Sequence, residues 1–408
     1  MRLVVLLAAL AQASTHGAAE LTQNPAVKAA LTDVRSGDLQ TIADQIRFCQ
    51  IPAPPFKEGA RGAELEKTFE QVGLRNVRVD KAGNVLGDYS GAAPHPRLVM
   101  AAHLDTVFPE GTDVTVRREG AVLHGPGIGD DCRGLAVIVS VARALAQAHV
   151  QLPGTITFVA DVGEEGLGDL RGMKQLFNDT LKGQVDAFVT VDSMGLSEAH
   201  TFVGSHRYRV TFKGPGGHSF GAFGLANPAD ALGRAVAKIA DLQVPKDPKT
   251  TFNVGRIGGG TSINAIPTEA WMEVDLRSAD RRALESLDTS FQRAVDAAVR
   301  EENERWGTPR LLIVTKELVG DRPAGSEPDS APIVLTDRDV LGALGFSGTT
   351  AVGSSDANYP LSLGIPSLDI GGGGRGAENH SPAESYDTTD AWKGTERALL
   401  LAIALAQR

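Results

Sequence analysis

Short apolar runs alternate with longer helical patterns along most of the chain. Four of these runs have the length and composition of buried strands: 98–102, 155–160, 187–191 and 366–370. Between the first two runs lies the segment 134–148, which is apolar on most faces and long enough for a buried helix. A strand, a helix and a strand at this spacing predict a parallel sheet that helices cover on both faces.

The segment 200–316 follows a different pattern. Two runs, 207–212 and 270–276, alternate between apolar and polar residues as half-exposed strands do. Two others, 229–239 and 283–301, have the spacing of amphipathic helices. This segment therefore predicts a compact α+β unit.

These patterns divide the chain into two domains. We predict a discontinuous α/β domain over 20–199 and 317–408, built on a mixed, mostly parallel sheet with helices on both faces. The α+β domain over 200–316 is inserted into it.

Residues 1–19 predict a signal peptide. Arg2 precedes an apolar run over 3–11 and a small-x-small triplet over 11–13. The run is too short to span a bilayer as a helix. We therefore expect export to the periplasm or the medium, with a cytoplasmic enzyme as the alternative.

Net charge and cysteine content argue against some partners and against a disulfide-bonded structure. The net charge of −10 argues against nucleic acid or an anionic membrane surface as a partner. The two cysteines, Cys49 and Cys132, are too few for a disulfide scaffold and lack a CxxC zinc pattern. We expect two free thiols, although a bridge between them is not ruled out by the sequence.

Histidines and acids follow the predicted strands where each strand ends. In chain order they are His103, Glu164, Glu165, Asp192 and His380. In an open parallel sheet, ligands bind outside the carboxyl ends of the strands. These side chains, although far apart in sequence, are therefore expected to line one crevice.

The same side chains predict a site for two divalent metal ions. Buried charges without a counter-charge are costly, and imidazole with carboxylate suits Zn²⁺, with Co²⁺ or Mn²⁺ as substitutes. Asp130, in the loop before the predicted helix 134–148, is placed to bridge the ions. His103 and Asp192 then complete one site, and Glu165 and His380 complete the other. Each ion keeps a position for a shared hydroxide, and three carboxylates plus this hydroxide balance the charge.

Two further acids have predicted supporting roles. Asp105 lies two residues from His103, so on a strand it would project to the same side and hydrogen-bond the imidazole. Glu164 precedes a ligand and points elsewhere, which makes it the predicted general base for the attacking water. Taken singly, each residue is more often a surface or capping residue. Their joint placement carries the prediction.

Four motifs resemble a known family. They are MAAHLDTV over 100–107, GPGIGDD over 125–131, GEEG over 163–166 and GGHS over 216–219. They occur in the order found in the family of peptidase T, bacterial glutamate carboxypeptidase, aminoacylase and acetylornithine deacetylase. The resemblance runs over 51–387. It implies a dizinc exopeptidase with the ligands and base named above, and a cis peptide bond after the bridging aspartate.

The resemblance also implies roles for the inserted domain. It implies a lid that forms the homodimer contact, with His218 reaching an active site, often that of the other subunit, to stabilise the oxyanion. Asn264 and Arg277 match positions that hold the substrate carboxylate. Arg375, in a glycine-rich loop, is a candidate for one more carboxylate contact. Cys132 departs from the family's usual lysine and is expected close to the metals.

The substrate is the least determined part of the prediction. Asp192, in place of glutamate, is nearer to the peptidase T branch and favours a di- or tripeptidase. An N-acyl-amino-acid deacylase or a carboxypeptidase would use the same centre. A non-catalytic binding protein on the same fold is disfavoured, because it would have no need for Glu164.

Overall fold

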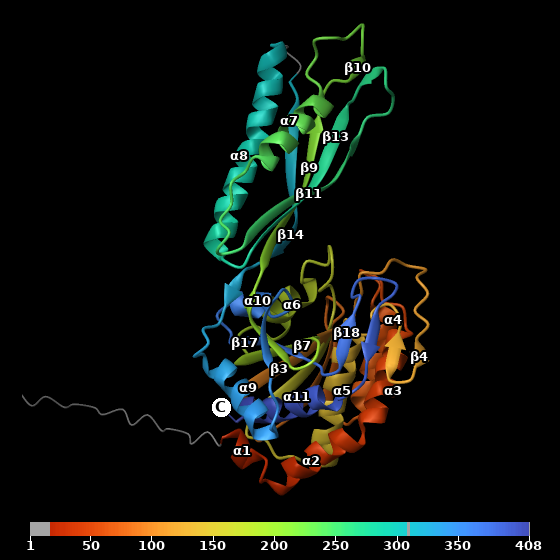
Figure 1. The fold of residues 1–408 in the computed structure, drawn as a ribbon, viewed down its shortest axis with the longest axis vertical. Helices are drawn as coiled ribbons and strands as arrows, with labels where there is room; N and C mark the ends of the chain where they lie inside the picture. The colour runs from red at the N-terminus through yellow and green to blue at the C-terminus, as the bar shows by residue number, and fades with distance from the viewer. Residues whose placement is uncertain (1–16, 308–310, 408) are drawn as a thin grey trace, which may run out of the picture.

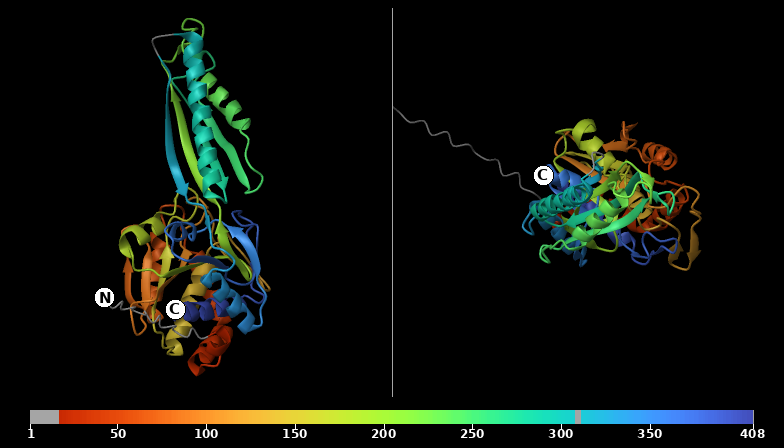
Figure 2. Two further views of the ribbon diagram at one scale, coloured as in Figure 1. Left: turned by 90° about the vertical axis from the view of Figure 1, so that its left-hand side faces the viewer. Right: turned by 90° about the horizontal axis from the view of Figure 1, so that it is seen from above.

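The computed structural model describes residues 17–307 and 311–407. Figure 1 shows two parts, a lower one built around the large sheet and an elongated upper one, and Figure 2 shows that they meet at a narrow junction. Residues 1–16, which hold most of the predicted signal peptide, lie outside the described residues, so export stays a prediction. Among the described helices, none has both the length and the apolarity that crossing a membrane requires.

The lower part is built on a nine-stranded mixed sheet. Its order is β1-β2-β6-β3-β7-β17-β8-β15, with β16 beside β8. The central strands β6, β3, β7 and β17 run parallel, whereas β1, β2 and β15 pair antiparallel with their neighbours. The strands are β1 (Arg75–Val79), β2 (Val85–Tyr89), β3 (Arg97–His103), β6 (Thr155–Asp161), β7 (Ala187–Ser193), β8 (Ser197–Phe202), β15 (Gly325–Ser326), β16 (Thr349–Gly353) and β17 (Ser367–Gly371).

Helices cover both faces of this sheet, and the predicted α/β fold is confirmed. Along β3, Met100 and Ala102 pack into the core under α5 and α11, while Val99 and Ala101 pack into a second core under α6 and η1. The helices are α1 (Ala18–Leu21), α2 (Pro25–Ser36), α3 (Asp38–Cys49), α4 (Gly59–Gln71), α5 (Cys132–Gln147), α6 (Arg171–Gln175), the π-helix η1 (Leu176–Thr180), α9 (Pro332–Leu344), α10 (Asn358–Ser362) and α11 (Trp392–Leu405).

A small four-stranded sheet joins two distant segments beside the large one. Its order is β18-β19-β5-β4, and Ser385 of β19 pairs with His124 of β5. The strands are β4 (Arg117–Glu119), β5 (Val122–His124), β18 (Arg375–Ala377) and β19 (Ser385–Asp387). This pairing places the loop after β5 next to the loop before β19.

The upper part is the inserted α+β domain. An antiparallel sheet of order β11-β13-β9-β14 is covered on one face by two helices (Figure 2). In β13, Met272, Val274 and Leu276 point under the helices and the residues between them face outward. The elements are β9 (Gly204–Lys213), β10 (Gly217–His218), α7 (Pro228–Ala240), β11 (Thr250–Gly259), β12 (Ala265–Ile266), β13 (Glu269–Ser278), α8 (Arg281–Trp306) and β14 (Ile313–Arg322).

Two strands of this four-stranded sheet, β11 and β14, were not predicted from the sequence. In β11 three glycines interrupt the alternation of apolar and polar residues, and β14 is exposed along much of its length. Pairing with β13 and β9 decides their conformation, which a local pattern does not reveal. The domain boundary that we drew at 316 falls inside β14, which continues to Arg322.

Candidate metal centre

The carboxyl ends of the central strands bring the five predicted ligands together. His103 ends β3, Asp192 lies near the end of β7, and Glu165 follows β6. Their ligand atoms form two sets, each within 4.8 Å: His103 with Asp130 and Asp192, and Asp130 with Glu165 and His380. Asp130 belongs to both sets, in the bridging place that the sequence predicted for it.

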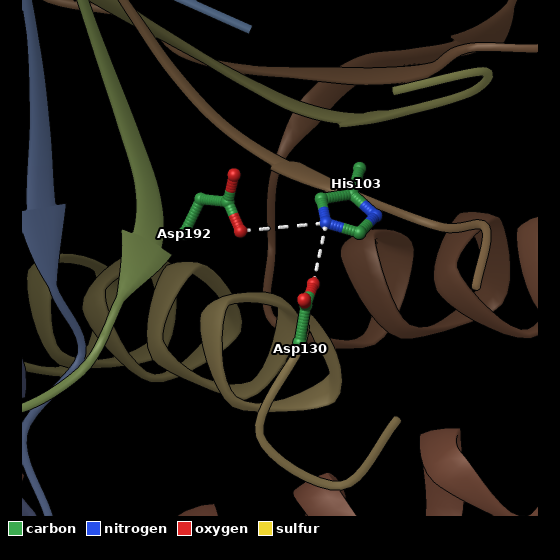
Figure 3. Close-up of side chains that lie close together, drawn as sticks. All are labelled: His103, Asp130 and Asp192. Atoms are coloured by element: carbon green, nitrogen blue, oxygen red, sulfur yellow. Dashed lines mark hydrogen bonds and ion pairs between the residues drawn. The ribbon is translucent and has the colours of Figure 1, made fainter. Parts of the chain in front are cut away.

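The first set, drawn in Figure 3, is the more deeply buried of the two. The Nε2 atom of His103 is 3.1 Å from Oδ1 of Asp130 and 3.4 Å from Oδ1 of Asp192. His103 is fully buried, and its ring lies between the end of β7 and the loop before α5. Its other nitrogen, Nδ1, is 3.0 Å from the carbonyl oxygen of Asp105.

The second set lies toward the solvent. The Nε2 atom of His380 is 3.0 Å from Oδ2 of Asp130 and 2.9 Å from Oε1 of Glu165. Asp130 therefore contributes one oxygen to each set. The peptide bond between Asp130 and Asp131 is cis, as the resemblance implied.

The electrostatics of these groups fit bound cations. Burial raises the pKa of Asp192 well above its ordinary value and also raises the pKa of Glu165. Hydrogen bonds to Asp130 and Glu165 raise the pKa of His380 to about 11. Burial alone would lower the pKa of His103, but attraction to Asp192 and hydrogen bonds to both aspartates raise it well above its ordinary value.

The carboxylates of the two sets lie close together and largely out of water, so their negative charges need a positive counter-charge. Divalent cations can supply it while the two imidazoles stay neutral. Imidazole nitrogen and carboxylate oxygen are donors that suit zinc. Each of the two sets offers three protein ligands, which is the number found at catalytic zinc sites with an open position. The donor set therefore fits two metal ions.

Asp105 supports the centre in a different way from the one predicted. Its carboxylate accepts hydrogen bonds from the backbone N–H groups of Gly163 (2.9 Å), Glu164 (3.2 Å) and Glu165 (2.9 Å). Its Oδ1 is 3.8 Å from Nδ1 of His103, so the imidazole is bound by the Asp105 carbonyl oxygen instead. The prediction assumed strand geometry, but β3 ends at His103 and Asp105 lies beyond it.

Glu164 and Glu165 are neighbours in sequence with different partners. Glu165 contacts His380, whereas Oε1 of Glu164 accepts a hydrogen bond from Nη1 of Arg322 at 2.6 Å. The carbonyl oxygen of Glu164 accepts a second bond from Nη2 of the same arginine. Both glutamates are buried, and a Glu164 oxygen lies within 4.8 Å of ligand atoms of His103 and Glu165. Glu164 therefore lies beside the ligands but is held by a cation of the protein.

A cavity of about 250 Å³ opens over these groups, and arginines form part of its wall. Arg207, Arg277 and Arg322 line it together with members of both ligand sets. Arg277 was predicted from the resemblance. Arg322 was not, because it ends a strand that the sequence pattern did not predict. Arg375 lies on β18 and is not among the lining residues.

Two of the predicted site residues lie far from this cavity. His218 on β10 and Asn264 beside β12 are exposed at the far end of the inserted domain (Figure 1). The Ser219 N–H group donates to the Asn264 carbonyl oxygen at 2.9 Å, so the two segments are held together. Phe220 and Ile263, on the same two segments, are strongly exposed apolar residues.

The cysteines lie close to the centre but inside the core. Cys49 ends α3 and Cys132 begins α5, directly after the cis peptide bond. Both are free and fully buried. Cys132 thus lies two residues from Asp130, one of the predicted ligands, but is covered from solvent.

Comparisons with known proteins agree with this geometry. The chain is 24% identical over 343 residues to succinyl-diaminopimelate desuccinylase of Corynebacterium glutamicum, covering 80% of this chain and 86% of that protein. It is 27% identical over 333 residues to carboxypeptidase G2 of Pseudomonas sp., covering 76% and 75% of the two chains.

Solved structures show the same fold. Aminopeptidase PepT of Bacillus cereus superposes with a TM-score of 0.72 at 20% identity, over 91% of this chain and 99% of that one. A tripeptidase of Staphylococcus aureus superposes with a TM-score of 0.72 at 21% identity, over 90% of this chain and 98% of that one. The sequence profile described as "Peptidase family M20/M25/M40" matches residues 99–404, which is well over half of the chain. The chain therefore belongs to peptidase family M20/M25/M40 and is a metal-dependent hydrolase.

Proposed function

We propose that this enzyme hydrolyses the amide bond of small peptides that carry a free carboxylate, with di- and tripeptides as its main substrates. The observation that carries the proposal is the cavity itself. It joins two metal-binding sets, a buried glutamate that is in neither predicted ligand triad, and three arginines in a volume of about 250 Å³. This volume suits a small substrate.

The two ions, for which zinc is the first candidate, would be held by the two ligand sets with Asp130 between them. When bound, such ions polarise the scissile carbonyl and make water a stronger acid. Asp105 accepts hydrogen bonds from the N–H groups of Gly163, Glu164 and Glu165, so the proposed base and the proposed ligand keep a fixed relation. The outward position of His380 leaves the second set open to substrate.

Glu164 is the proposed general base. Arg322 holds its carboxylate beside the ligands, so the group is oriented before substrate arrives. A carboxylate in this place takes a proton from the attacking water and transfers it to the leaving amine. Glu165 contacts His380 instead and is assigned to metal binding.

The arginines of the wall support recognition of a substrate carboxylate. Guanidinium groups bind carboxylates through paired, charge-assisted hydrogen bonds. Arg277 is partly exposed and shares Asp275 with Arg207, which leaves net positive charge at this wall. Similar proteins include a carboxypeptidase and a tripeptidase, and these names support a peptide substrate.

An N-acyl amino acid is the second candidate substrate. It presents the same amide bond and the same carboxylate, and similar proteins include a desuccinylase and an N-acetylcysteine deacetylase. The two substrate classes differ only in the acyl side of the bond.

We also propose that two copies of the chain form a homodimer through the inserted domain. His218 and Asn264 lie at its exposed end, away from the cavity of their own chain (Figure 1). Phe220, Phe223 and Ile263 expose large apolar side chains at this end, and burial of such side chains favours contact with a partner. In such a dimer, His218 of one subunit would stabilise the developing oxyanion in the cavity of the other.

The first prediction concerns Glu164. Glu164→Gln should lower kcat by about 10²- to 10⁴-fold, because it removes the proton acceptor, while the protein still binds two metal ions per chain. The matched control is Glu165→Gln, which should lose metal as well as activity. Steady-state kinetics and elemental analysis measure both. Loss of metal from Glu164→Gln would show that Glu164 is a ligand and not the base.

The second prediction concerns carboxylate recognition. Arg277→Ala should reduce kcat/KM by about 10- to 100-fold for peptides with a free carboxylate, because a charge-assisted bond is lost. The same peptides with an amidated terminus should be poor substrates that the substitution hardly affects. Arg256→Ala removes an exposed arginine of the same domain outside the cavity and should change neither. Equal losses on both kinds of peptide would contradict the assignment.

The third prediction tests the shared active site. His218→Ala and Glu164→Gln should each be nearly inactive as homodimers. Mixed dimers of the two variants should regain activity, because one of their two sites then has both residues intact. Native mass spectrometry confirms subunit exchange before the assay. Mixed dimers that stay inactive would rule out action of His218 across the dimer.

A further inference from the structure

A buried carboxylate that the proposed chemistry does not use lies behind the bridging aspartate. Glu384 is fully buried, and its carboxylate accepts three hydrogen bonds from the backbone of the loop before α5. The donors are the N–H groups of Gly127 (2.8 Å), Gly129 (2.9 Å) and Asp130 (3.1 Å). The Glu384 carbonyl oxygen accepts a fourth bond, from the Gly125 N–H group at 3.1 Å. Successive N–H groups of a loop form a concave site for an anion, and here a side chain fills it.

The loop is shaped for this contact. Gly127 has φ 76°, in the left-handed region that favours glycine. A Cβ atom at Gly129 would lie 3.3 Å from Oε1 of Glu384, so the carboxylate packs tightly against the backbone of the loop. The carbonyl oxygen of Ile128 is held separately by Gln45. The N–H groups of Gly127, Gly129 and Asp130 therefore have Glu384 as their hydrogen-bond acceptor.

The place of Glu384 in the chain connects the two halves of the centre. It lies four residues after His380 and directly before β19, which pairs with β5. The loop that it binds ends in Asp130. His380 and Asp130 then meet with 3.0 Å between Nε2 and Oδ2. The Glu384 side chain thus connects the segment that carries His380 to the loop that carries Asp130.

We infer that Glu384 is a positioning residue for the metal centre: its carboxylate fixes the loop so that Asp130 keeps one oxygen beside His103 and the other beside His380. The inference rests on the two-metal centre of the proposed function. Both carboxylate oxygens are engaged, since Oε2 accepts from Gly127 and Oε1 accepts from Gly129 and Asp130. A glutamine at this position has the same shape, but its NH₂ group would face an N–H donor and could not accept that hydrogen bond.

The test compares zinc binding by the metal-free wild-type enzyme, Glu384→Gln and a matched control. The control is Glu302→Gln, which alters a fully buried glutamate of α8 that also accepts a backbone N–H bond, far from the centre. Zinc affinity is measured by competition with a chromophoric chelator, and thermal unfolding of the metal-free proteins is followed by circular dichroism. Glu384→Gln should bind zinc about 10- to 100-fold more weakly while remaining folded, and Glu302→Gln should match the wild type.

The outcomes separate this inference from the proposed function. Wild-type zinc affinity in a folded Glu384→Gln would overturn the positioning role alone. A wild-type enzyme that binds no zinc, cobalt or manganese would overturn both. If Glu384→Gln does not fold, hydrogen exchange on the metal-free wild type gives the answer. Strong protection of the Gly127, Gly129 and Asp130 amides supports the role, and exchange as fast as in an open loop overturns it.

Discussion

Sharing of Asp130 between two imidazoles is the interaction on which the rest of the site depends. Its two oxygens lie 3.1 Å from His103 and 3.0 Å from His380, so one carboxylate orders two ligand sets. Three carboxylates that are shielded from most of the solvent and lie against two histidines are costly unless cations bind between them. The centre must therefore be held by groups outside it. Asp105 holds the backbone of the two glutamates, and Glu384 holds the loop of Asp130.

The fold brings these groups together from segments that are far apart in the sequence. His103, Glu165 and Asp192 come from the ends of parallel strands at the centre of the sheet, and the pairing of β5 with β19 brings in the other two ligands. The inserted domain adds Arg207, Arg277 and Arg322 at its base. Its far end carries His218 away from its own cavity. A complete catalytic set by this account needs a second copy of the chain.

The four central strands of the large sheet and the ligands at their ends were predictable because two local signals coincide there. Buried parallel strands are apolar throughout, and the polar residue that ends each run stands out against them. His103 and Asp192 are such residues. Arg322 had no such signal, because it ends an exposed strand whose pairing is decided by tertiary contacts. Glu384 was missed because its partners are backbone groups more than 250 residues earlier. The carboxylate of Asp105 was misassigned, because strand alternation was extended past the end of β3.

Metal content and activity, measured together, show whether this chain is a two-metal hydrolase. The purified enzyme is dialysed against a chelator, and zinc, cobalt or manganese is then returned in steps while bound metal and peptide hydrolysis are followed on the same samples. Hydrolysis should disappear with the metal, return on addition of any of the three ions, and reach its maximum at two ions per chain. Full hydrolysis by enzyme from which all metal has been removed would contradict this prediction.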